Sequence, residues 1–533
     1  MLISHILKAR VDLLWVGGIG TYIKASSESH TDVGDKSNDA LRINANELRC
    51  RVIGEGGNLG MSQLARVEYG LAGGRSNTDF IDNAGGVDCS DHEVNIKILL
   101  NAVVERGDLT GKQRNVLLED MTDSVAALVL QNNYRQTQAI SLAEAEVQER
   151  SGEYRRYISN LEVAGKLNRQ LEFIPSDQDL ADRRVQGQGL TRPELAVLVS
   201  YSKAILKEEL IASDLGLDPH LAAAVTTAFP PQLLERYPEE VAEHGLRREI
   251  MCTQVANDIV NRLGFNFVPR QRKATGAPVA DVARAYTAVM HIYAVDELWA
   301  RVEALDYTVD AAVQQTMMHC LMRLVRRASR WLLRNRRHEM APTRAIAEFA
   351  EGVAQLREAL PTMLRGRAAE QYRAMSEHWQ QAGVDASLAE AVAGALQGYT
   401  ALGIVQAARE TEAPLMHVAE LYFEMGERLQ LDWFSGQILA SKVENEWQAL
   451  ARDTYLEDLE WQQRTLAVGA LRYLTADGSL DGCLQTWEEQ QAALLSRWQD
   501  MVTELHTTDS PDFAMFAVAV RELLDLAQSS LRT

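Results

Sequence analysis

Two short apolar runs near the start of the chain each end in a cluster of glycines, and they constrain the fold more than any other feature. "VDLLWV" (11–16) leads into "GGIG", and "LRCRVIGEGGN" (48–58) carries the second run and the second cluster. Short β-rich runs that end in glycine and precede a helical pattern are typical of the βα units of a parallel sheet. The intervening "DKSNDALRI" predicts a helix. The chain is therefore expected to open with an α/β region built on a partial parallel sheet.

Beyond about residue 110 the pattern becomes helical. In "KQRNVLLEDMTDSVAALVLQNNY" apolar residues recur three and four positions apart, as on one face of a helix. Two helix starts are marked by capping boxes, Ser176 with Asp179 and Thr191 with Glu194. No repeat of roughly 20–50 residues is visible, which argues against a regular solenoid.

The patterns divide the chain into three predicted parts. "FNFVPRQRKATGAPVAD" (265–281), with two prolines and a glycine, is expected to be a loop near the second division. The predicted fold class is thus α/β followed by a large all-α region, predominantly helical overall. The three parts are an α/β domain (1–140), a first helical sub-bundle (141–270) and a helical C-terminal domain (271–533).

Composition and charge exclude some functions. The net charge of −20 argues against a dedicated nucleic-acid binder. No apolar run approaches the roughly 18–20 residues that span a bilayer, and "MLISHILKARVDLLWV" lacks the features of a signal peptide. An odd number of scattered cysteines without a CxxC pair indicates free thiols in a reducing compartment, so a cytoplasmic protein is expected. The five are Cys50, Cys89, Cys252, Cys320 and Cys483.

Both glycine clusters are candidate ligand contacts. The first matches a dinucleotide fingerprint poorly, because Ile23 stands where the third glycine should be; Asp35 and Asp39 lie about 20 residues downstream. Ligands of open α/β sheets bind beyond the carboxyl ends of the strands. The alternative is a pair of ordinary tight turns. The candidate cofactor contacts are Gly17, Gly18, Gly20, Gly56, Gly57 and Asn58.

The stretch "DNAGGVDCSDHEVN" allows three interpretations. A metal site would use Cys89, Asp91, His92 and Glu93, but adjacent residues do not converge on one ion from a helix. A nucleophile paired with His92 meets the same difficulty. The plainest interpretation is a helix entry, with Ser90 as the N-cap and Glu93 closing a capping box. Such an N-terminus also attracts carboxylate or phosphate groups.

The arginine-dense "RLVRRASRWLLRNRR" (323–337) is the one feature that resembles a nucleic-acid binder. Its apolar residues recur with helical spacing, so an amphipathic helix with a basic face is predicted. In so acidic a chain, ion pairing within the protein or between subunits is the favoured interpretation. Nucleic acid is not expected as a partner.

Several long motifs together resemble a known family. They are "DLLWVGGIGTYIKAS", "GEGGNLGMSQLARVEY", "NTDFIDNAGGVDCSDHEVNIKILLN", "GLTRPELAVLVSYSK" and "HGLRREI". In this order they are similar to the large NAD-specific glutamate dehydrogenases of bacteria, to at least about residue 335, and the final 200 residues resemble the family only in general helical character. The resemblance implies the end of a Rossmann-like domain followed by a helical domain. It also implies oxidative deamination of L-glutamate to 2-oxoglutarate and ammonia, with hydride transfer to NAD.

The resemblance also implies roles for individual residues. Asn58 and Asn83 would contact the nicotinamide end of NAD, and Gly85 and Gly86 would allow its close approach. The substrate would be contacted by Val87 and by Ser90, whose hydroxyl would donate to the side-chain carboxylate of glutamate. No metal is implied.

The family's catalytic lysine and aspartate have no counterpart in this chain. Lys24, Lys36 and Lys97 lie in motifs that do not correspond to the catalytic one. The chain is therefore expected to be the C-terminal portion of a longer enzyme, with Met1 an internal start, and to be inactive alone. The alternative is a non-catalytic helical assembly or regulatory subunit with a vestigial cofactor fold. In either case a homo-oligomer formed through the helical domain is expected, without a membrane partner.

Overall fold

The chain forms two compact units in the computed structural model. One comprises residues 1–273 with 277–284, and the other 274–276 with 285–533. Helices account for 73% of the structure and the only sheets among the described residues are small and parallel, which confirms the predicted fold class. The three-part division stays a prediction. The residues described are 2–216, 218–336, 340–443, 446–474, 480–509 and 511–532.

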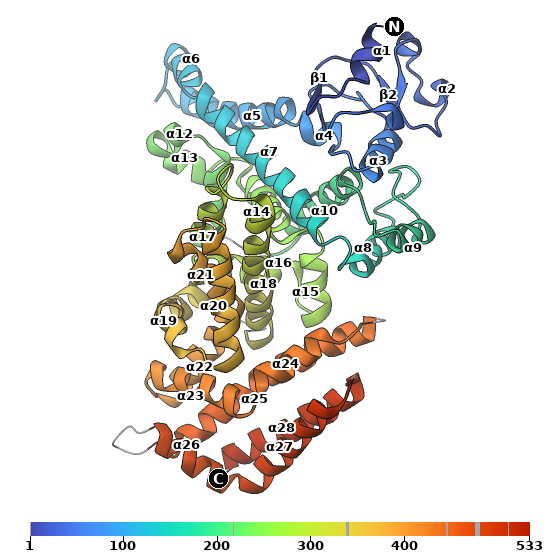
Figure 1. The fold of residues 1–533 in the computed structure, drawn as a ribbon. Helices are drawn as coiled ribbons and strands as arrows, with labels where there is room; N and C mark the ends of the chain where they lie inside the picture. Colours follow the sequence, from blue (N-terminus) through green and yellow to red (C-terminus); the bar gives the residue numbers. More distant parts are fainter. Residues whose placement is uncertain are drawn as a thin grey trace. The chain divides into compact units, whose positions relative to one another are not determined.

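The first unit opens with two pairs of parallel strands (Figure 1). Strands β1 (Leu13–Val16) and β4 (Val52–Glu55) pair in parallel along their whole length, with Leu13 opposite Val52 and Val16 opposite Glu55. This confirms the strands predicted from the two glycine-terminated runs. The second pair, β2 (Ile23–Lys24) and β3 (Ile43–Asn44), was not predicted.

A small core holds these strands together. Ile23, Ile53 and Met61 are at most 2% exposed, and Ala65 and Tyr69 bring helix α3 (Gln63–Leu71) against them. The phenolic oxygen of Tyr69 donates to the carbonyl of Cys50 at 3.0 Å, so its polar end is also satisfied. The buried apolar surface therefore fixes the position of both β1 and β4 relative to α3.

The helix predicted for "DKSNDALRI" is wrong. Only a single 3-10 turn, η1 (Lys36–Asn38), forms there, and β3 begins at Ile43. The carboxylate of Asp35 accepts from the backbone N–H of Thr21 at 2.9 Å and from the side chain of Asn38 at 2.6 Å. Short polar side chains that bond local backbone groups compete with helix formation in this way.

The rest of the first unit is helical, as predicted. Both predicted capping boxes are confirmed, at Ser176 for α9 and at Thr191 for α10. The helices are α1 (Leu2–Leu7), α2 (His30–Val33), α4 (Asp79–Asp82), α5 (Gly85–Glu105), α6 (Gly111–Asp120), α7 (Thr122–Ala145), α8 (Ser151–Val163), α9 (Asp177–Val185), α10 (Arg192–Ala212), α11 (Pro219–Ala222), α12 (Pro231–Arg236), α13 (Pro238–Ala242), α14 (Arg247–Leu263) and α15 (Phe267–Thr275), with the 3-10 turns η2 (Ala45–Glu47) and η3 (Ala223–Ala228).

The loop predicted for "FNFVPRQRKATGAPVAD" is wrong, because α15 forms within it. Pro269 falls in the first turn of that helix, where a backbone N–H has no partner in any case. Phe267, Val268 and Gln271 are buried, which stabilises the helix. Gly276, with φ of 72°, directly follows the last residue of α15.

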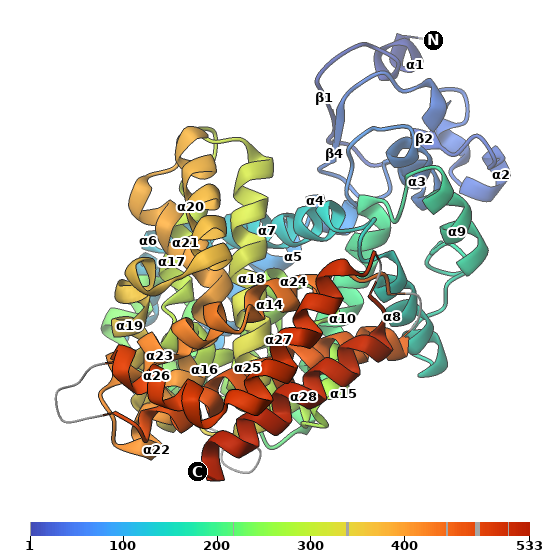
Figure 2. The same cartoon turned by 60° about the horizontal axis from the view of Figure 1, so that its bottom comes forward.

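The second unit consists of helices throughout its described residues, and the unit boundary falls within α16 (Val279–Ile292). Helices α25 and α28 run side by side in Figures 1 and 2. The helices are α17 (Val295–Glu303), α18 (Ala311–Asn335), α19 (Pro342–Met363), α20 (Gly366–Gln381), α21 (Ala386–Gly398), α22 (Ala401–Thr411), α23 (Leu415–Arg428), α24 (Leu431–Ala440), α25 (Glu446–Leu471), α26 (Leu480–Gln490), α27 (Ala492–Thr507) and α28 (Phe513–Arg532).

The basic helix predicted from the arginine run is α18, and two of its arginines form ion pairs within the protein. Arg330 donates to Asp453 at 2.9 Å and to Glu457 at 3.1 Å on α25, and Arg334 forms an ion pair with Glu457. Ion pairing within the protein or between subunits was favoured from the sequence, and these pairs are of the first kind. Arg337 lies outside the described residues.

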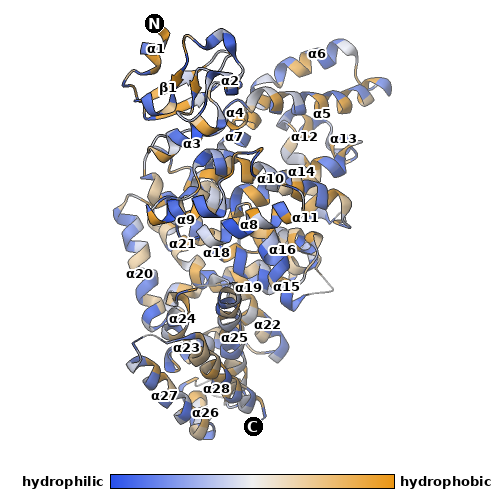
Figure 3. Ribbon diagram, turned by 90° about the vertical axis from the view of Figure 1, so that its right-hand side faces the viewer, coloured by the Kyte–Doolittle hydropathy of each residue, from blue (hydrophilic) through white to orange (hydrophobic). Residues whose placement is uncertain are grey.

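Most helices of both units carry one hydrophobic and one hydrophilic face (Figure 3). Within the described part of the chain, no single helix is long and apolar enough to cross a membrane. Only α21 and α22 taken together pass that test, across a bend of 63°. Most of their residues, including Val392, Leu402 and Ile404, are buried inside the second unit.

Candidate functional site

The two glycine turns lie against each other at the carboxyl ends of β1 and β4. The backbone N–H groups of Gly56 and Gly57 donate to the carbonyl of Val16 at 3.0 and 3.1 Å. A Cβ atom on Gly57 would lie 2.7 Å from the carbonyl oxygen of Gly18. Glycine is therefore required at position 57 for the two turns to approach this closely.

Trp15 occupies the space that other glycines leave free. A Cβ on Gly54 would lie 2.7 Å from its ring, and one on Gly56 would lie 2.5 Å from it. The ring covers these glycines on one face of the sheet and is itself 60% exposed. Gly17 also lies beside this ring, whereas Gly20, with φ of 133°, adopts a backbone conformation that favours glycine. Backbone geometry thus accounts for Gly20 and packing for Gly56, whereas a Cβ on Gly17 would make ordinary contacts 3.4 Å from the ring.

Asn58 and Asn83 meet although they lie on different segments. The side-chain amide of Asn83 donates to the amide oxygen of Asn58. Asn58 follows β4, and Asn83 ends α4. Their bond leaves the amide nitrogen of Asn58 and the amide oxygen of Asn83 without another partner among the described residues. A primary carboxamide could accept from the Asn58 nitrogen through its own oxygen and donate to the Asn83 oxygen through its own nitrogen.

Ser90 is not a helix N-cap, contrary to the prediction. Helix α5 begins at Gly85, and Ser90 lies in its second turn, where its hydroxyl donates to the carbonyl of Gly86 at 3.1 Å. The two glycines belong to the first turn, where the backbone N–H groups have no partner within the helix, so the helix starts before the serine. Glu93 forms an ion pair with Lys97 instead of a capping box.

Gly86, Val87 and Ser90 share the exposed face of α5. Val87 is 70% exposed, and a Cβ on Gly86 would meet nothing within 4 Å. Residues three and four apart lie on one face of a helix. The protein's own packing does not require glycine at position 86. This face is therefore open to a ligand along the first turns of the helix.

A buried ion pair fixes the turn after β4. The guanidinium of Arg66 donates to both carboxylate oxygens of Glu55, at 2.7 and 2.9 Å, and the two side chains are 4% and 1% exposed. Glu55 also accepts the backbone N–H of Met61 at 3.0 Å. Burial raises the pKa of Glu55, and the bonds from Arg66 oppose that shift. The pair ties the end of β4 to α3.

Two aspartates of α4 extend this network to Asn83. Asp79 accepts the backbone N–H of Leu59 at 2.8 Å and lies 3.3 Å from the guanidinium of Arg66. Asp82 accepts the N–H of Glu55 at 3.1 Å. Leu59 has φ of 59°, a strained conformation for leucine, which the bond from Asp79 helps to hold. Sequence reasoning missed these residues, although an acid at the end of an apolar strand indicates a buried cation nearby.

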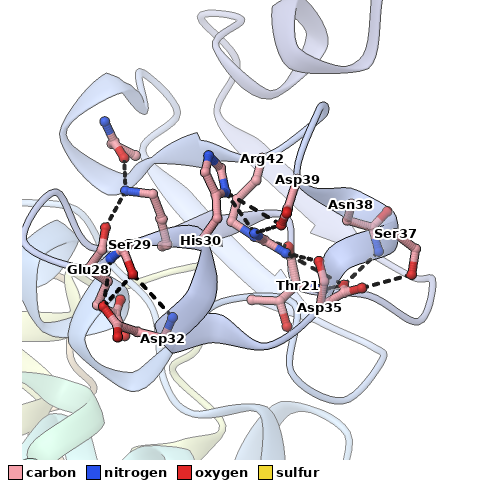
Figure 4. Close-up of polar contacts among 12 residues, drawn as sticks. Thr21, Glu28, Ser29, His30, Asp32, Asp35, Ser37, Asn38, Asp39 and Arg42 are labelled. Atoms are coloured by element: carbon pink, nitrogen blue, oxygen red, sulfur yellow. Dashed lines mark hydrogen bonds and ion pairs between the residues drawn. The ribbon is translucent and has the colours of Figure 1, made fainter.

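Asp35 and Asp39, which follow the first glycine turn, bind the protein itself (Figure 4). Arg42, whose side chain is fully buried, donates to Asp39 at 2.6 Å and to the carbonyl of Thr21 at 2.8 Å. Hydrogen bonds from Asn38 and from the backbone of Thr21 lower the pKa of Asp35. Both aspartates therefore stabilise the loop that follows the first glycine turn.

His92 is a structural residue on the buried face of α5. Its Nδ1 donates to the carbonyl of Ala228 at 2.9 Å, and its Nε2 lies 3.8 Å from Asp88. Asp88 in turn accepts from Asn132 of α7 at 2.9 Å. No group of three histidine, cysteine or acidic side chains among the described residues could hold a metal ion. Cys89 is exposed, and all five cysteines are free.

Lys203 of α10 tests whether α10 packs against α5 near Asp88. Burial lowers its pKa to about 8, although Asp88 opposes the shift. The unfolded pKa is about 10.4, so folding is penalised below pH 8, and the penalty disappears as the pH rises past the unfolded value. Lys203→Met is expected to raise the free energy of unfolding at pH 7 by up to about 3 kcal/mol.

The advantage of Lys203→Met over wild type should shrink between about pH 8 and 10. Denaturant unfolding across this pH range measures it, with Lys207→Met as the control for loss of a lysine from the same helix. A constant difference at all pH values would contradict the buried position of the ammonium group.

Two family models match the chain and cover most of it. The description of the first is "Bacterial NAD-glutamate dehydrogenase, catalytic domain", over residues 1–143. The second is "Glutamate dehydrogenase, C-terminal", over residues 187–525. The chain thus matches a catalytic-domain model over its first part and a C-terminal model over most of the remainder, and it belongs to the bacterial NAD-glutamate dehydrogenase family. The predicted resemblance is confirmed.

Three relatives of the chain are named NAD-specific glutamate dehydrogenase. The chain is 52% identical over 529 residues to the NAD-specific glutamate dehydrogenase of Pseudomonas aeruginosa, 49% to that of Halomonas elongata and 37%, over 531 residues, to that of Mycobacterium tuberculosis. The matches cover 99–100% of this chain and 33% of each relative. The chain therefore spans about a third of the length of the curated relatives that it matches.

Proposed function

We propose that this chain forms part of the nicotinamide and substrate site of an NAD-dependent glutamate dehydrogenase, which deaminates L-glutamate oxidatively to 2-oxoglutarate and ammonia. The observation that carries the proposal is the bond between Asn58 and Asn83 beside the open first turn of α5. The names of the relatives and the match to the catalytic-domain model support it.

The unsatisfied groups of the asparagine pair suit the carboxamide of nicotinamide, which needs one acceptor and one donor. Gly18 and Gly57 keep the sheet edge free of side chains, and Gly85 and Gly86 do the same for the start of α5. NAD, when bound, accepts the hydride from glutamate. The role proposed for the residues of this chain is to bind and orient NAD and glutamate. No general acid or base is proposed among them.

Val87 and Ser90 would contact glutamate on the exposed face of α5. The Ser90 hydroxyl can turn from the Gly86 carbonyl to a substrate carboxylate, because its present partner is a weak bond within the helix. Val87, with its 70% exposed side chain, would pack against the methylene groups of the substrate. Both contacts fix orientation rather than carry out a chemical step.

An apolar sheet face supports a role within a larger catalytic domain. Leu13 and Trp15 project to one face of β1 and are 56% and 60% exposed, and Val52, opposite Leu13, is 39% exposed. Parallel sheets are normally covered on both faces. We propose that the remainder of the catalytic domain covers this face in the active enzyme.

The proposal is tested in a chimera in which this chain replaces the matching third of the Pseudomonas aeruginosa enzyme. The chimera is expected to reduce NAD in the presence of glutamate. Asn58→Asp should raise its KM for NAD about tenfold, because a lost hydrogen bond is worth about 1–1.5 kcal/mol. Asn115→Asp on α6 is the control. A folded, oligomeric chimera without activity would contradict the proposal and favour an assembly or regulatory role.

Gly86→Ala should separate stability from binding. Alanine is favoured over glycine within a helix by about 0.5–1 kcal/mol, and the new Cβ meets no protein atom within 4 Å. The variant is expected to be at least as stable as wild type in thermal unfolding, while the chimera carrying it binds NAD or glutamate less tightly. Gly111→Ala, at the first turn of α6, should leave the kinetics unchanged. Unchanged kinetics for Gly86→Ala as well would mean that no ligand approaches this turn.

We further propose a cytoplasmic location and self-association through the helical domain. The free cysteines support the first. The second is supported by Trp447, Leu450 and Trp461 of α25, of which Trp447 is 80% exposed. Exposed aromatic residues are enriched at protein interfaces. Sedimentation of the chain and of Trp447→Glu would show whether this face mediates the contact.

A further inference from the structure

A cavity of about 210 Å³ lies in the second unit, far along the sequence from the residues proposed for the nicotinamide and substrate site. Helices α18, α20, α21, α23, α24 and α25 contribute its walls. Every lining residue belongs to that one unit. Nothing proposed above assigns a ligand to it.

Four arginines line this cavity. Arg323 and Arg327 come from α18, and Arg365 and Arg367 from the start of α20. Arg323 and Arg367 make no ion pair or side-chain hydrogen bond with any described residue. Arg327 stacks on the ring of Tyr399, with its guanidinium carbon 3.4 Å from the ring centre. Arg323, Arg365 and Arg367 are exposed to solvent. Arg365 donates to the carbonyls of Thr362 and Leu364, whereas Arg323 and Arg367 keep donors that the protein does not use.

The acidic groups in the walls do not balance these charges. Only two line the cavity, Asp432 and Glu460, against four arginines, of which Arg365 lies 3.8 Å from the carboxylate of Glu424. Glu460 is 8% exposed, and its Oε1 has no hydrogen-bond partner among the described residues. Burial raises the pKa of both carboxyl groups, although Arg464 and Arg327 oppose the shift at Glu460 and Arg367 opposes it at Asp432. The cavity is a positive site in a chain whose net charge is −20.

Apolar and aromatic side chains form the rest of the wall. They include Leu396, Tyr422, Phe423 and Leu431. Ligand sites typically combine an apolar lining with a few converging polar groups that fix orientation. A bare inorganic ion would leave this part of the surface without a contact.

We propose that the cavity binds an organic anion that carries at least two carboxylate or phosphate groups on an apolar or aromatic frame. The planar guanidinium group binds both kinds of oxyanion through paired N–H donors. Like charges held together within a concave surface attract an anion more strongly than isolated ones do. The inference does not depend on the proposed dehydrogenase function.

The test is calorimetric titration of the 533-residue chain with two probes at low ionic strength. Benzene-1,4-diyl bis(phosphate) represents the phosphate class and isophthalate the carboxylate class, because each carries two oxyanion groups on an aromatic ring. At least one is expected to bind in a 1:1 ratio, and the tighter of the two identifies the class. The double variant Arg323→Ala with Arg367→Ala should weaken that binding at least tenfold. No binding of either probe at millimolar concentration would overturn the proposal.

Two further variants distinguish a loss of the anion site from misfolding of the double variant. Arg373→Ala removes an exposed arginine from α20 that does not line the cavity, and it should leave the affinity unchanged. Asp432→Asn removes a negative charge from the wall and should tighten binding severalfold. Equal loss of binding in Arg373→Ala and in the double variant would show that general surface charge, rather than this cavity, attracts the anion.

Discussion

Arg66→Met is expected to lower the local free energy of unfolding around β4 and α3 by about 3–5 kcal/mol, because it leaves the carboxylate of Glu55 buried without its cation. Amide hydrogen exchange in these two elements measures the effect, since it reports the stability of one region within a chain of two units. The methionine retains much of the apolar volume, so the loss reflects mainly the missing charge and hydrogen bonds.

The matched control is Arg51→Met, which removes an exposed arginine whose pair with Asp12 spans 3.4 Å. Exposed pairs contribute about 0–1 kcal/mol. The deficit of Arg66→Met should also narrow as the pH falls below 7. Arg66 lowers the pKa of Glu55, so its loss raises that pKa further, and protonation then removes the buried charge at a higher pH in the variant than in wild type. Equal effects of Arg51→Met and Arg66→Met would contradict the assignment of the buried pair.

Ser90→Ala in the chimera is expected to raise the KM for glutamate about tenfold to a hundredfold, which corresponds to the roughly 1.5–3 kcal/mol of a hydrogen bond to a charged group. The same variant should leave the stability of the chain almost unchanged. Its hydroxyl is exposed and bonds only the Gly86 carbonyl within the helix, a contact that contributes little to helix stability.

Cys89→Ala is the adjacent control, because this side chain is also exposed on α5. It should change neither the KM for glutamate nor the melting temperature. If Ser90→Ala lowers stability while leaving the KM unaltered, Ser90 has a structural role only, and the proposed substrate contact is wrong.

The sheet edge could be predicted because its signals are local. A strand that ends in glycines records in sequence both where the strand stops and where the backbone must pass close to another segment. The prediction of β1 and β4 and of glycine turns beyond them therefore needed no long-range information. The capping boxes of α9 and α10 were predictable for the same reason, since each involves residues three positions apart.

The errors had more than one cause. The helix predicted for "DKSNDALRI" fails because the side chain of Asp35 bonds Thr21 and Asn38. A pair of glycines normally discourages a helix, yet α5 begins at Gly85. A segment with two prolines indicated a loop, yet burial of Phe267 and Val268 stabilises α15. Similarly, no local pattern links Glu55 to Arg66 or Asn58 to Asn83, because each pair is joined only by the fold.

The network around the β4 turn has a genetic consequence. Arg66, Asp79 and Asp82 hold the turn that presents Asn58 toward Asn83, so alleles at these positions would be inherited as binding defects although none of the three lies at the proposed contact surface. Second-site revertants of Asp79→Ala should include Leu59→Gly, because glycine adopts a φ of 59° without the support of a carboxylate. Substitutions at Leu59 and Asp79 would then have to be compatible with each other for the turn to keep its conformation.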